Sequence, residues 1–153
     1  MRLYLVQHGE AKSENVDPQR SLTDKGMRDV QKVAGFLKAL GPAVSEIRHS
    51  GKARAAQTAE ILAHSFSVGR GVREKAGLAP LDPVEPTAKQ LIGMSEDLML
   101  VGHLPFMGHL ASYLIAGDES LDAVAFQQGG VVCLESDERS GWRVRWMITP
   151  DIL

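Results

Sequence analysis

The sequence has one cysteine, Cys133, and few aromatic side chains, which make up 5% of its 153 residues. One cysteine excludes an internal disulfide and a zinc or redox site built from paired cysteines. Because Cys133 stands in the apolar run 131–134, we expect a buried thiol in the core. Neither charge dominates, since 17 basic side chains stand against 19 acidic ones. We therefore expect no nucleic-acid partner and no membrane partner, and any phosphate site must be local.

Long apolar runs are also lacking, apart from residues 98–117, which contain no charged side chain. A membrane-spanning helix would have to bury two histidines, Pro105 and several glycines of this segment, at a cost of several kcal/mol. We expect a strand, a turn and a buried helix here instead. Residues 1–6 are too few for the apolar core of a secretory signal, so the expected location is the cytoplasm.

The spacing of apolar residues predicts strands that alternate with helices. Helices are expected between Thr23 and Gly41, over 54–66 and after Pro105. Strands are expected over 2–6, 44–49, 97–101, 131–134 and 142–148. The last two should form a hairpin with a polar turn at 135–141. Residues 67–97 are less readable, with one short strand and one short helix around 88–94.

These patterns predict which side chains share a face on the first helix and on the last strand. The buried stripe of the first helix is expected to contain Met27, Val30, Ala34, Leu37 and Leu40. On the last strand, alternation predicts Trp142, Val144, Trp146 and Ile148 on one face, with Arg143 and Arg145 on the other.

This order of elements predicts an α/β fold, a three-layer α/β/α sandwich with a mostly parallel mixed central sheet, in which residues 1–153 form a single domain. In such sheets ligands bind beyond the carboxyl ends of the strands. Polar clusters follow three of the expected strands, at residues 7–10, residues 49–54 and residues 102–103. We expect them to converge on one site, which should be open because the chain is too short for a sizeable lid.

Two histidines beside arginines suit phosphoryl chemistry. A neutral imidazole, with a free pKa of about 6.5, can act as a nucleophile and carry a phosphoryl group. Gly9 would let the chain turn sharply, so that phosphate can approach the backbone. Either histidine alone could equally be a core side chain. Of the others, His64 is expected on the surface, and His49 near the site without an assigned role.

Other phosphate and metal motifs are missing. Neither His8-x-Glu10 nor His103-x5-His109 supplies a third zinc ligand at a recognised spacing, so no metal is expected. Gly51-Lys52 has neither the first glycine nor the Ser or Thr of a P-loop, and the chain has no GxGxxG.

Four segments, in order, resemble the histidine phosphatase superfamily, and within it the small SixA-type phosphohistidine phosphatases. They are Val6-Gln7-His8-Gly9-Glu10, Arg20-Ser21-Leu22-Thr23-x-x-Gly26, Ser50-x-x-x-Arg54-Ala55-x-Gln57-Thr58 and Val101-Gly102-His103-Leu104-Pro105. The resemblance covers nearly the whole chain and implies a phosphoglycerate mutase-like fold, without a metal or organic cofactor.

The resemblance also implies roles for matching residues. His8 corresponds to the nucleophile, which is phosphorylated during turnover and oriented by a backbone carbonyl. Arg54, at the start of a helix, His103 and Arg20 correspond to phosphate-binding side chains. The implied substrate is a phosphorylated histidine on a partner protein, such as a phosphotransfer domain. A small phosphate ester and a noncatalytic phosphate- or phosphoprotein-binding role are the alternatives.

One position departs from the family pattern. Gln7 stands where the family has an arginine, and an amide brings no charge and no bidentate fork to a phosphoryl oxygen. The loss is about 3 kcal/mol in the transition state, or about a hundredfold in rate, by comparison with oxyanion donors. Arg20, Arg54 and Lys12 can offset part of it. We therefore expect a working but slower phosphatase.

Two carboxylates are candidates for the proton donor to the leaving group. Glu10, two residues after His8, is the first candidate, and Glu74 is the second. For each, the alternative is a solvated surface carboxylate.

Overall fold

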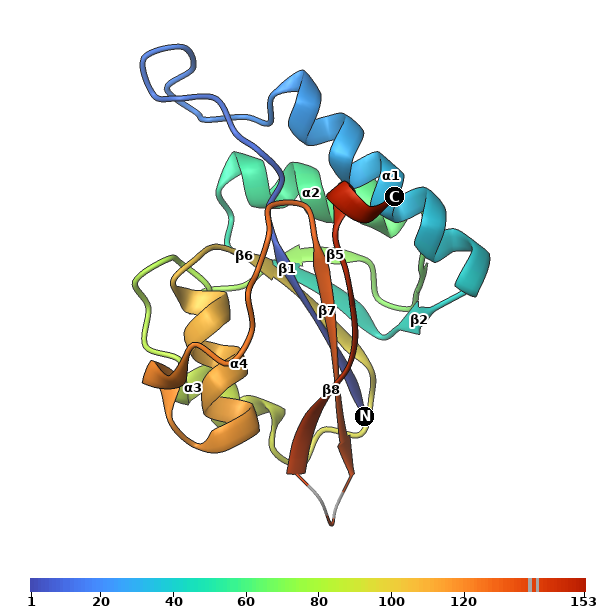
Figure 1. The fold of residues 1–153 in the computed structure, drawn as a ribbon, viewed down its shortest axis with the longest axis vertical. Helices are drawn as coiled ribbons and strands as arrows, with labels where there is room; N and C mark the ends of the chain where they lie inside the picture. The colour runs from blue at the N-terminus through green and yellow to red at the C-terminus, as the bar shows by residue number, and fades with distance from the viewer. Residues whose placement is uncertain (138, 140) are drawn as a thin grey trace.

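The computed structural model describes residues 1–137, 139 and 141–153. A six-stranded sheet with the order β5-β3-β6-β1-β7-β8 forms the centre of the molecule (Figure 1). The four strands β5, β3, β6 and β1 are parallel, whereas β7 and β8 are antiparallel to their neighbours. The strands are β1 (Arg2–Gln7), β3 (Glu46–His49), β5 (Val72–Glu74), β6 (Leu98–Gly102), β7 (Val131–Asp137) and β8 (Gly141–Ile148). The predicted mixed, mostly parallel sheet is confirmed.

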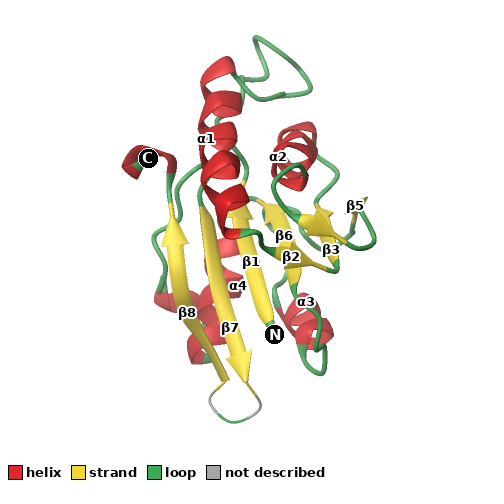
Figure 2. Cartoon of the chain, turned by 90° about the vertical axis from the view of Figure 1, so that its right-hand side faces the viewer, coloured by secondary structure: helices red, strands yellow, loops and turns green. Residues whose placement is uncertain are grey.

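Helices cover both faces of this sheet. Those on one face are α1 (Asp24–Leu40) and α2 (Ala53–Ala63), and those on the other are α3 (Glu85–Leu91) and α4 (Phe106–Ala116) (Figure 2). The central strand β1 is buried on both faces, because Tyr4 and Val6 join the core under α1 and α2 while Leu3 and Leu5 join the core under α3 and α4. These are the three layers of the predicted sandwich.

Smaller elements complete the chain. Two short 3₁₀ helices, η1 (Glu119–Leu121) and η2 (Pro150–Ile152), follow α4 and β8. The expected strand 44–49 is divided, since Val44 belongs to β2 (Ala43–Val44), which pairs with β4 (Ser67–Val68) apart from the main sheet. The division falls at Ser45, whose N–H and hydroxyl both donate to the carbonyl of Asp97 instead of joining a ladder.

The ends of α1 are as predicted, but its buried stripe is different. Thr23 accepts a hydrogen bond from the N–H of Gly26 at 2.9 Å, and Gly41 ends the helix in the left-handed conformation. Met27 and Leu40 are exposed, contrary to prediction, and Val33 is buried in addition to the other expected residues. Gly26 faces the core instead of Met27, because α1 contacts the backbone of Glu10 there so closely that a Cβ would overlap it.

Two other helices are displaced from their predicted ranges. Helix α2 ends at Ala63, and Phe66 is buried in the turn beyond it, with its ring edge-on to Tyr4 at 5.3 Å between centroids. Helix α3 spans 85–91 and not 88–94, because Pro86 suits its first turn and Gly93 adopts a positive φ of 84° after it.

The alternation expected for β8 is interrupted by a bulge. Cys133 pairs with Trp146, but Leu134 pairs with Val144, so that Arg145 is an extra residue. An extra residue reverses the faces of a strand. Trp146 therefore packs into the core under α1 and α2, and Trp142 packs on the opposite face, contrary to prediction. In the expected turn, residues 138 and 140 lie outside the described residues.

The segment 98–117 forms β6 and α4, as expected. In the part of the chain that the structure describes, no helix combines the length and apolarity needed to cross a membrane. Cys133 is a buried free thiol, and burial raises its pKa to about 11.

Candidate active site

Three parallel strands bring the predicted polar clusters to one edge of the sheet. Gln7 ends β1 opposite Gly102 at the end of β6, and the N–H of His8 donates to the carbonyl of Gly102 at 2.9 Å. His49, at the end of β3, is opposite Val101. The rings of His8 and His103 consequently lie 5.0 Å apart between centroids.

His8 is held in one tautomer. Its side chain is 8% exposed, and its Nδ1 donates to the carbonyl of Gly9 at 2.6 Å. A carbonyl oxygen only accepts, so Nδ1 carries the proton and Nε2 keeps its lone pair. Burial is the largest cause that lowers the pKa of His8. The hydrogen bond to the Gly9 carbonyl raises this pKa, and the positive charges of Arg54 and Arg20 lower it further. His8 is therefore a neutral imidazole with an available nucleophilic nitrogen.

His103 is more deeply buried, at 2% exposed, and has one unpartnered nitrogen. Its Nε2 is hydrogen-bonded to Oγ of Ser50 at 2.6 Å, whereas its Nδ1 is buried without a partner. Burial, followed by His8, Arg54, Lys52 and Arg20, lowers the pKa of His103 to about 3. His103 is thus also neutral near pH 7. The sequence places Ser50 in a motif and near the cap of the helix that follows, but the N-cap residue is Lys52, and no sequence signal points to the contact of Ser50 with His103.

Arg54 lies in the first turn of α2, with its Nε buried and unpartnered. Burial and then the charge of Arg20 lower the pKa of its guanidinium. No side chain caps the start of α2. The N-terminus of this helix and the guanidinium together favour an anion.

Three buried side-chain atoms of the described residues lack a hydrogen-bond partner, and all three belong to predicted site residues. They are Gln7 Oε1, Arg54 Nε and His103 Nδ1. Each unsatisfied buried polar atom costs about 1–3 kcal/mol. A bound phosphoryl group would supply acceptors for Arg54 and His103. The oxygen and nitrogen of the Gln7 amide exchange places on a flip, so Gln7 can also present a donor.

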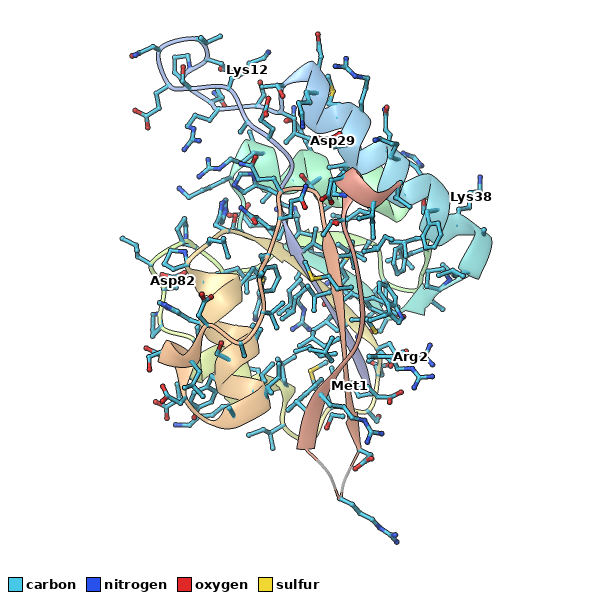
Figure 3. All side chains as sticks on the ribbon, in the orientation of Figure 1. Met1, Arg2, Lys12, Asp29, Lys38 and Asp82 are labelled. Carbon is cyan, nitrogen blue, oxygen red and sulfur yellow. The ribbon has the colours of Figure 1, made fainter. Side chains whose placement is uncertain are left out.

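Arg20 reaches the site from a projecting loop. Residues 11–22 leave the body of the molecule and return where Ala11 bridges to Leu22, and Lys12 lies on this loop (Figure 3). Arg20 has a positive φ of 50°, which is strained for a residue with a side chain, and its Nε donates to the carbonyl of Lys12 at 3.2 Å. Its charge acts on His8, Arg54 and His103. The loop therefore adds a positive charge to the electrostatic environment of the two histidines.

Gly9 is required for a different contact from the one expected. A Cβ at this position would come within 2.9 Å of the Val30 side chain and 3.0 Å of the Gly26 carbonyl. Its N–H donates to the Thr58 hydroxyl at 3.0 Å and so is not presented to phosphate. Gly9 thus allows the chain that follows β1 to pass closely under α1.

The two candidate proton donors, Glu10 and Glu74, lie on different elements of the fold. The Glu10 carboxylate accepts a hydrogen bond from the Thr23 hydroxyl at 2.8 Å, at the N-terminus of α1. Glu74 is exposed at the end of β5, and its carboxylate covers Gly51. His64 is exposed, as predicted. Among the described side chains, no group of three or more His, Cys, Asp or Glu is arranged to hold a metal ion.

A neutral imidazole with a free Nε2, beside a second imidazole, two guanidinium groups and a helix N-terminus, can accept a phosphoryl group and stabilise its oxygens. The fold and this edge of the sheet therefore define a phosphoryl-transfer protein.

Comparison with known proteins gives the family. The sequence model of the histidine phosphatase superfamily (branch 1) matches residues 3–82. The chain belongs to this superfamily and is a phosphatase.

Solved structures share the fold over the full chain. The protein histidine phosphatase SixA in complex with tungstate is 22% identical, with 99% of each chain covered and a TM-score of 0.85. A putative phosphohistidine phosphatase SixA from Agrobacterium tumefaciens is 23% identical, with 97% of each chain covered and a TM-score of 0.74. A putative α-ribazole-5'-P phosphatase from Escherichia coli is 16% identical, with 98% of each chain covered and a TM-score of 0.77. No curated protein matches the sequence.

Proposed function

We propose that the protein hydrolyses phosphohistidine on a partner protein through a covalent phospho-His8 intermediate. The observation that carries this proposal is the set of unpartnered buried atoms of Gln7, Arg54 and His103 around His8. The fold shared with SixA proteins supports the choice of phosphohistidine.

The reaction has two displacement steps. The lone pair on Nε2 of His8 attacks phosphorus, a P–N bond to His8 forms, and the P–N bond to the substrate histidine breaks. The leaving imidazole takes a proton as it departs. Water then attacks phosphorus, the bond to His8 breaks, and inorganic phosphate is released. In both steps Arg54, Arg20, His103 and Gln7 hold the equatorial oxygens.

Ser50 sets the tautomer of His103 in this mechanism. Its Oγ accepts a hydrogen bond from the N–H of Lys52 at 3.4 Å, so the hydroxyl proton is free to donate to Nε2 of His103. The imidazole proton is then on Nδ1, the unpartnered nitrogen, which becomes a donor to the phosphoryl group. Ser50 is a positioning residue, because it acts through His103.

Glu10 remains our first candidate for the proton donor, and Glu74 the second. The bond to Thr23 holds the Glu10 carboxylate at the N-terminus of α1, two residues along the chain from His8. A leaving imidazole of phosphohistidine needs only weak assistance, whereas the alkoxide of a phosphomonoester needs a strong acid. Glu10→Gln should therefore impair ester hydrolysis more than phosphohistidine hydrolysis. Equal effects on both substrates would assign Glu10 to the structure of α1 instead.

The decisive experiment compares a histidine-phosphorylated protein with a panel of phosphomonoesters. We expect faster turnover of phosphohistidine and an acid-labile, base-stable phosphoryl label on His8 that is absent in His8→Ala. Gln7→Arg should raise turnover by up to about a hundredfold, because it restores a charged donor. No detectable turnover by the unmodified protein would refute the proposal.

Hydrolysis of small phosphate esters is the second candidate function. It is favoured by the similarity of the fold to a putative α-ribazole-5'-P phosphatase. Preference for an ester in the same panel would select it. Gln7 motivates a third outcome, a phosphate- or phosphoprotein-binding module without catalysis, in which vanadate binds but no substrate is turned over.

A further inference from the structure

The surface beside His103 differs from the rest of the site. Leu104, the next residue, is 41% exposed, and Leu81, on the loop before α3, is 87% exposed. Two hollows of about 240 and 220 Å³ lie between these leucines and the 3₁₀ helix η1. They form one depression, because both are lined by Pro105, His109 and Glu119. We call this surface, made by residues 80–84, 104–109 and 119–122, the leucine flank.

The leucine flank begins at the residue that follows His103 in the chain. His103 is buried beside His8, and the chain emerges at Leu104 and Pro105 directly onto the depression. A partner protein whose phosphoryl group reaches His8 is therefore large enough to contact this surface as well. Exposed leucines are costly to keep in water, at about 25 cal/mol per Å² of apolar surface, and contiguous ones mark interaction sites.

The two flanks of the site have opposite charge. Lys12, Arg20 and Lys52 lie on the loop 11–22 and at the start of α2, whereas Asp82, Glu119 and Asp122 line the depression. Figure 3 shows Lys12 on the projecting loop and Asp82 beside α4, on the same side of the molecule. The basic groups suit the phosphoryl dianion. The acidic groups would repel a small polyanion, but they attract a substrate that carries cations beside its phosphate.

We propose that the leucine flank is the docking surface for the partner protein. It rests on the proposed function and specifies the partner's chemistry: an aliphatic side chain and a lysine or arginine adjacent to the phosphohistidine. The aliphatic side chain occupies the depression between Leu81 and Leu104, and the cation faces Glu119 and Asp122. A small anionic ester carries neither group, so the flank selects protein substrates.

Two phosphohistidine peptides of equal length test the proposal. One carries leucine and lysine beside the phosphohistidine, and the other carries serine and glutamate at the same positions. We expect kcat/KM to be at least tenfold higher for the first peptide. Leu81→Ser and Glu119→Lys should each reduce this preference at least threefold, and the double variant should nearly abolish it.

Matched controls lie elsewhere on the surface. Ile92 is 73% exposed, in the segment before β6 begins, and Glu60 is exposed on α2. Ile92→Ser and Glu60→Lys should leave the preference unchanged, and free phosphohistidine should be turned over equally by all variants. Equal kcat/KM for the two peptides, or a preference that survives the double variant, would overturn the docking surface.

Failure of the proposed function gives a separate result. If neither peptide is dephosphorylated, the docking surface is still tested with non-hydrolysable phosphohistidine analogues in the same two peptides. Tighter binding of the leucine–lysine peptide, lost in the double variant, supports the docking surface, and equal binding rejects it.

Discussion

The two ends of the parallel strands differ in whether their buried polar groups have hydrogen-bond or ion-pair partners. At the amino ends, the carboxylate of Glu46 is buried, and it forms ion pairs with Nε of Arg48 at 2.6 Å and with Nε of Arg73 at 3.3 Å. The carboxylate of Asp97 accepts from the N–H of Arg2 at 2.6 Å. At the carboxyl ends, His103 and Arg54 are left with unpartnered buried atoms. One end is therefore arranged for stability, and the other is prepared for a ligand.

The size of a hollow does not distinguish the two ends. A hollow of about 520 Å³ lies at the amino ends, beside Met1, Ile92 and Trp142. The N-terminal ammonium next to it is already bonded to the carbonyl of Ser136 at 3.1 Å. What marks the carboxyl end is unsatisfied hydrogen-bonding capacity, combined with burial and, after it, positive charge that lower the pKa of both histidines.

The largest expected effect separates the two ends by activity. His8→Ala removes the only nucleophile of the proposed mechanism and should lower kcat at least about a thousandfold. Asp97→Asn, at the other end, should leave kcat within about twofold. Turnover of a phosphohistidine peptide measures both. Comparable losses in the two variants would mean that activity depends on general stability and not on the carboxyl-end site.

Stability should change in opposite directions at the two ends. Glu46→Gln leaves Arg48 without its carboxylate and should destabilise the fold by about 2 kcal/mol, a buried-pair loss reduced by the exposure of Arg73. His103→Leu replaces an unsatisfied buried nitrogen by apolar atoms and should stabilise the empty protein by about 1 kcal/mol while abolishing activity. Urea denaturation measures both. Destabilisation by His103→Leu would show that the unpartnered Nδ1 does not lower the free energy of unfolding of the empty protein.

The sequence was informative where a pattern is local. The caps at Thr23 and Gly41 and the order of strands and helices follow from short-range rules. The convergence of residues 7–10, 49–54 and 102–103 follows from one general property of parallel sheets, that their carboxyl ends share an edge. The grouping of these residues at one edge of the sheet could therefore be predicted before any distance was known.

Long-range contacts explain what could not be predicted. The bulge at Arg145 depends on how β8 pairs with β7, and no spacing within β8 reveals it. Gly9 is needed because α1 crosses above it. Ser50 matters because β3 and β6 are adjacent, which brings its hydroxyl to a histidine far along the chain.

The smallest expected effect tests the protonation state of His8 and the tautomer of His103. Because the pKa of His8 is lowered, its neutral form persists below pH 6.5, and kcat/KM should fall only as the pH drops through this lowered pKa. Ser50→Ala should reduce kcat/KM about tenfold near pH 8, because neutral His103 is no longer held with its proton on Nδ1.

The ratio of Ser50→Ala to the unmodified protein should approach one as the pH falls, since protonated His103 carries a proton on Nδ1 whatever Ser50 does. Because burial and then the neighbouring His8, Arg54, Lys52 and Arg20 lower the pKa of His103 to about 3, this recovery is expected only at the acid end of the profile. Ser50→Thr, which keeps the hydroxyl, should restore activity at every pH. A constant ratio across the profile would assign Ser50 to packing and not to the tautomer of His103.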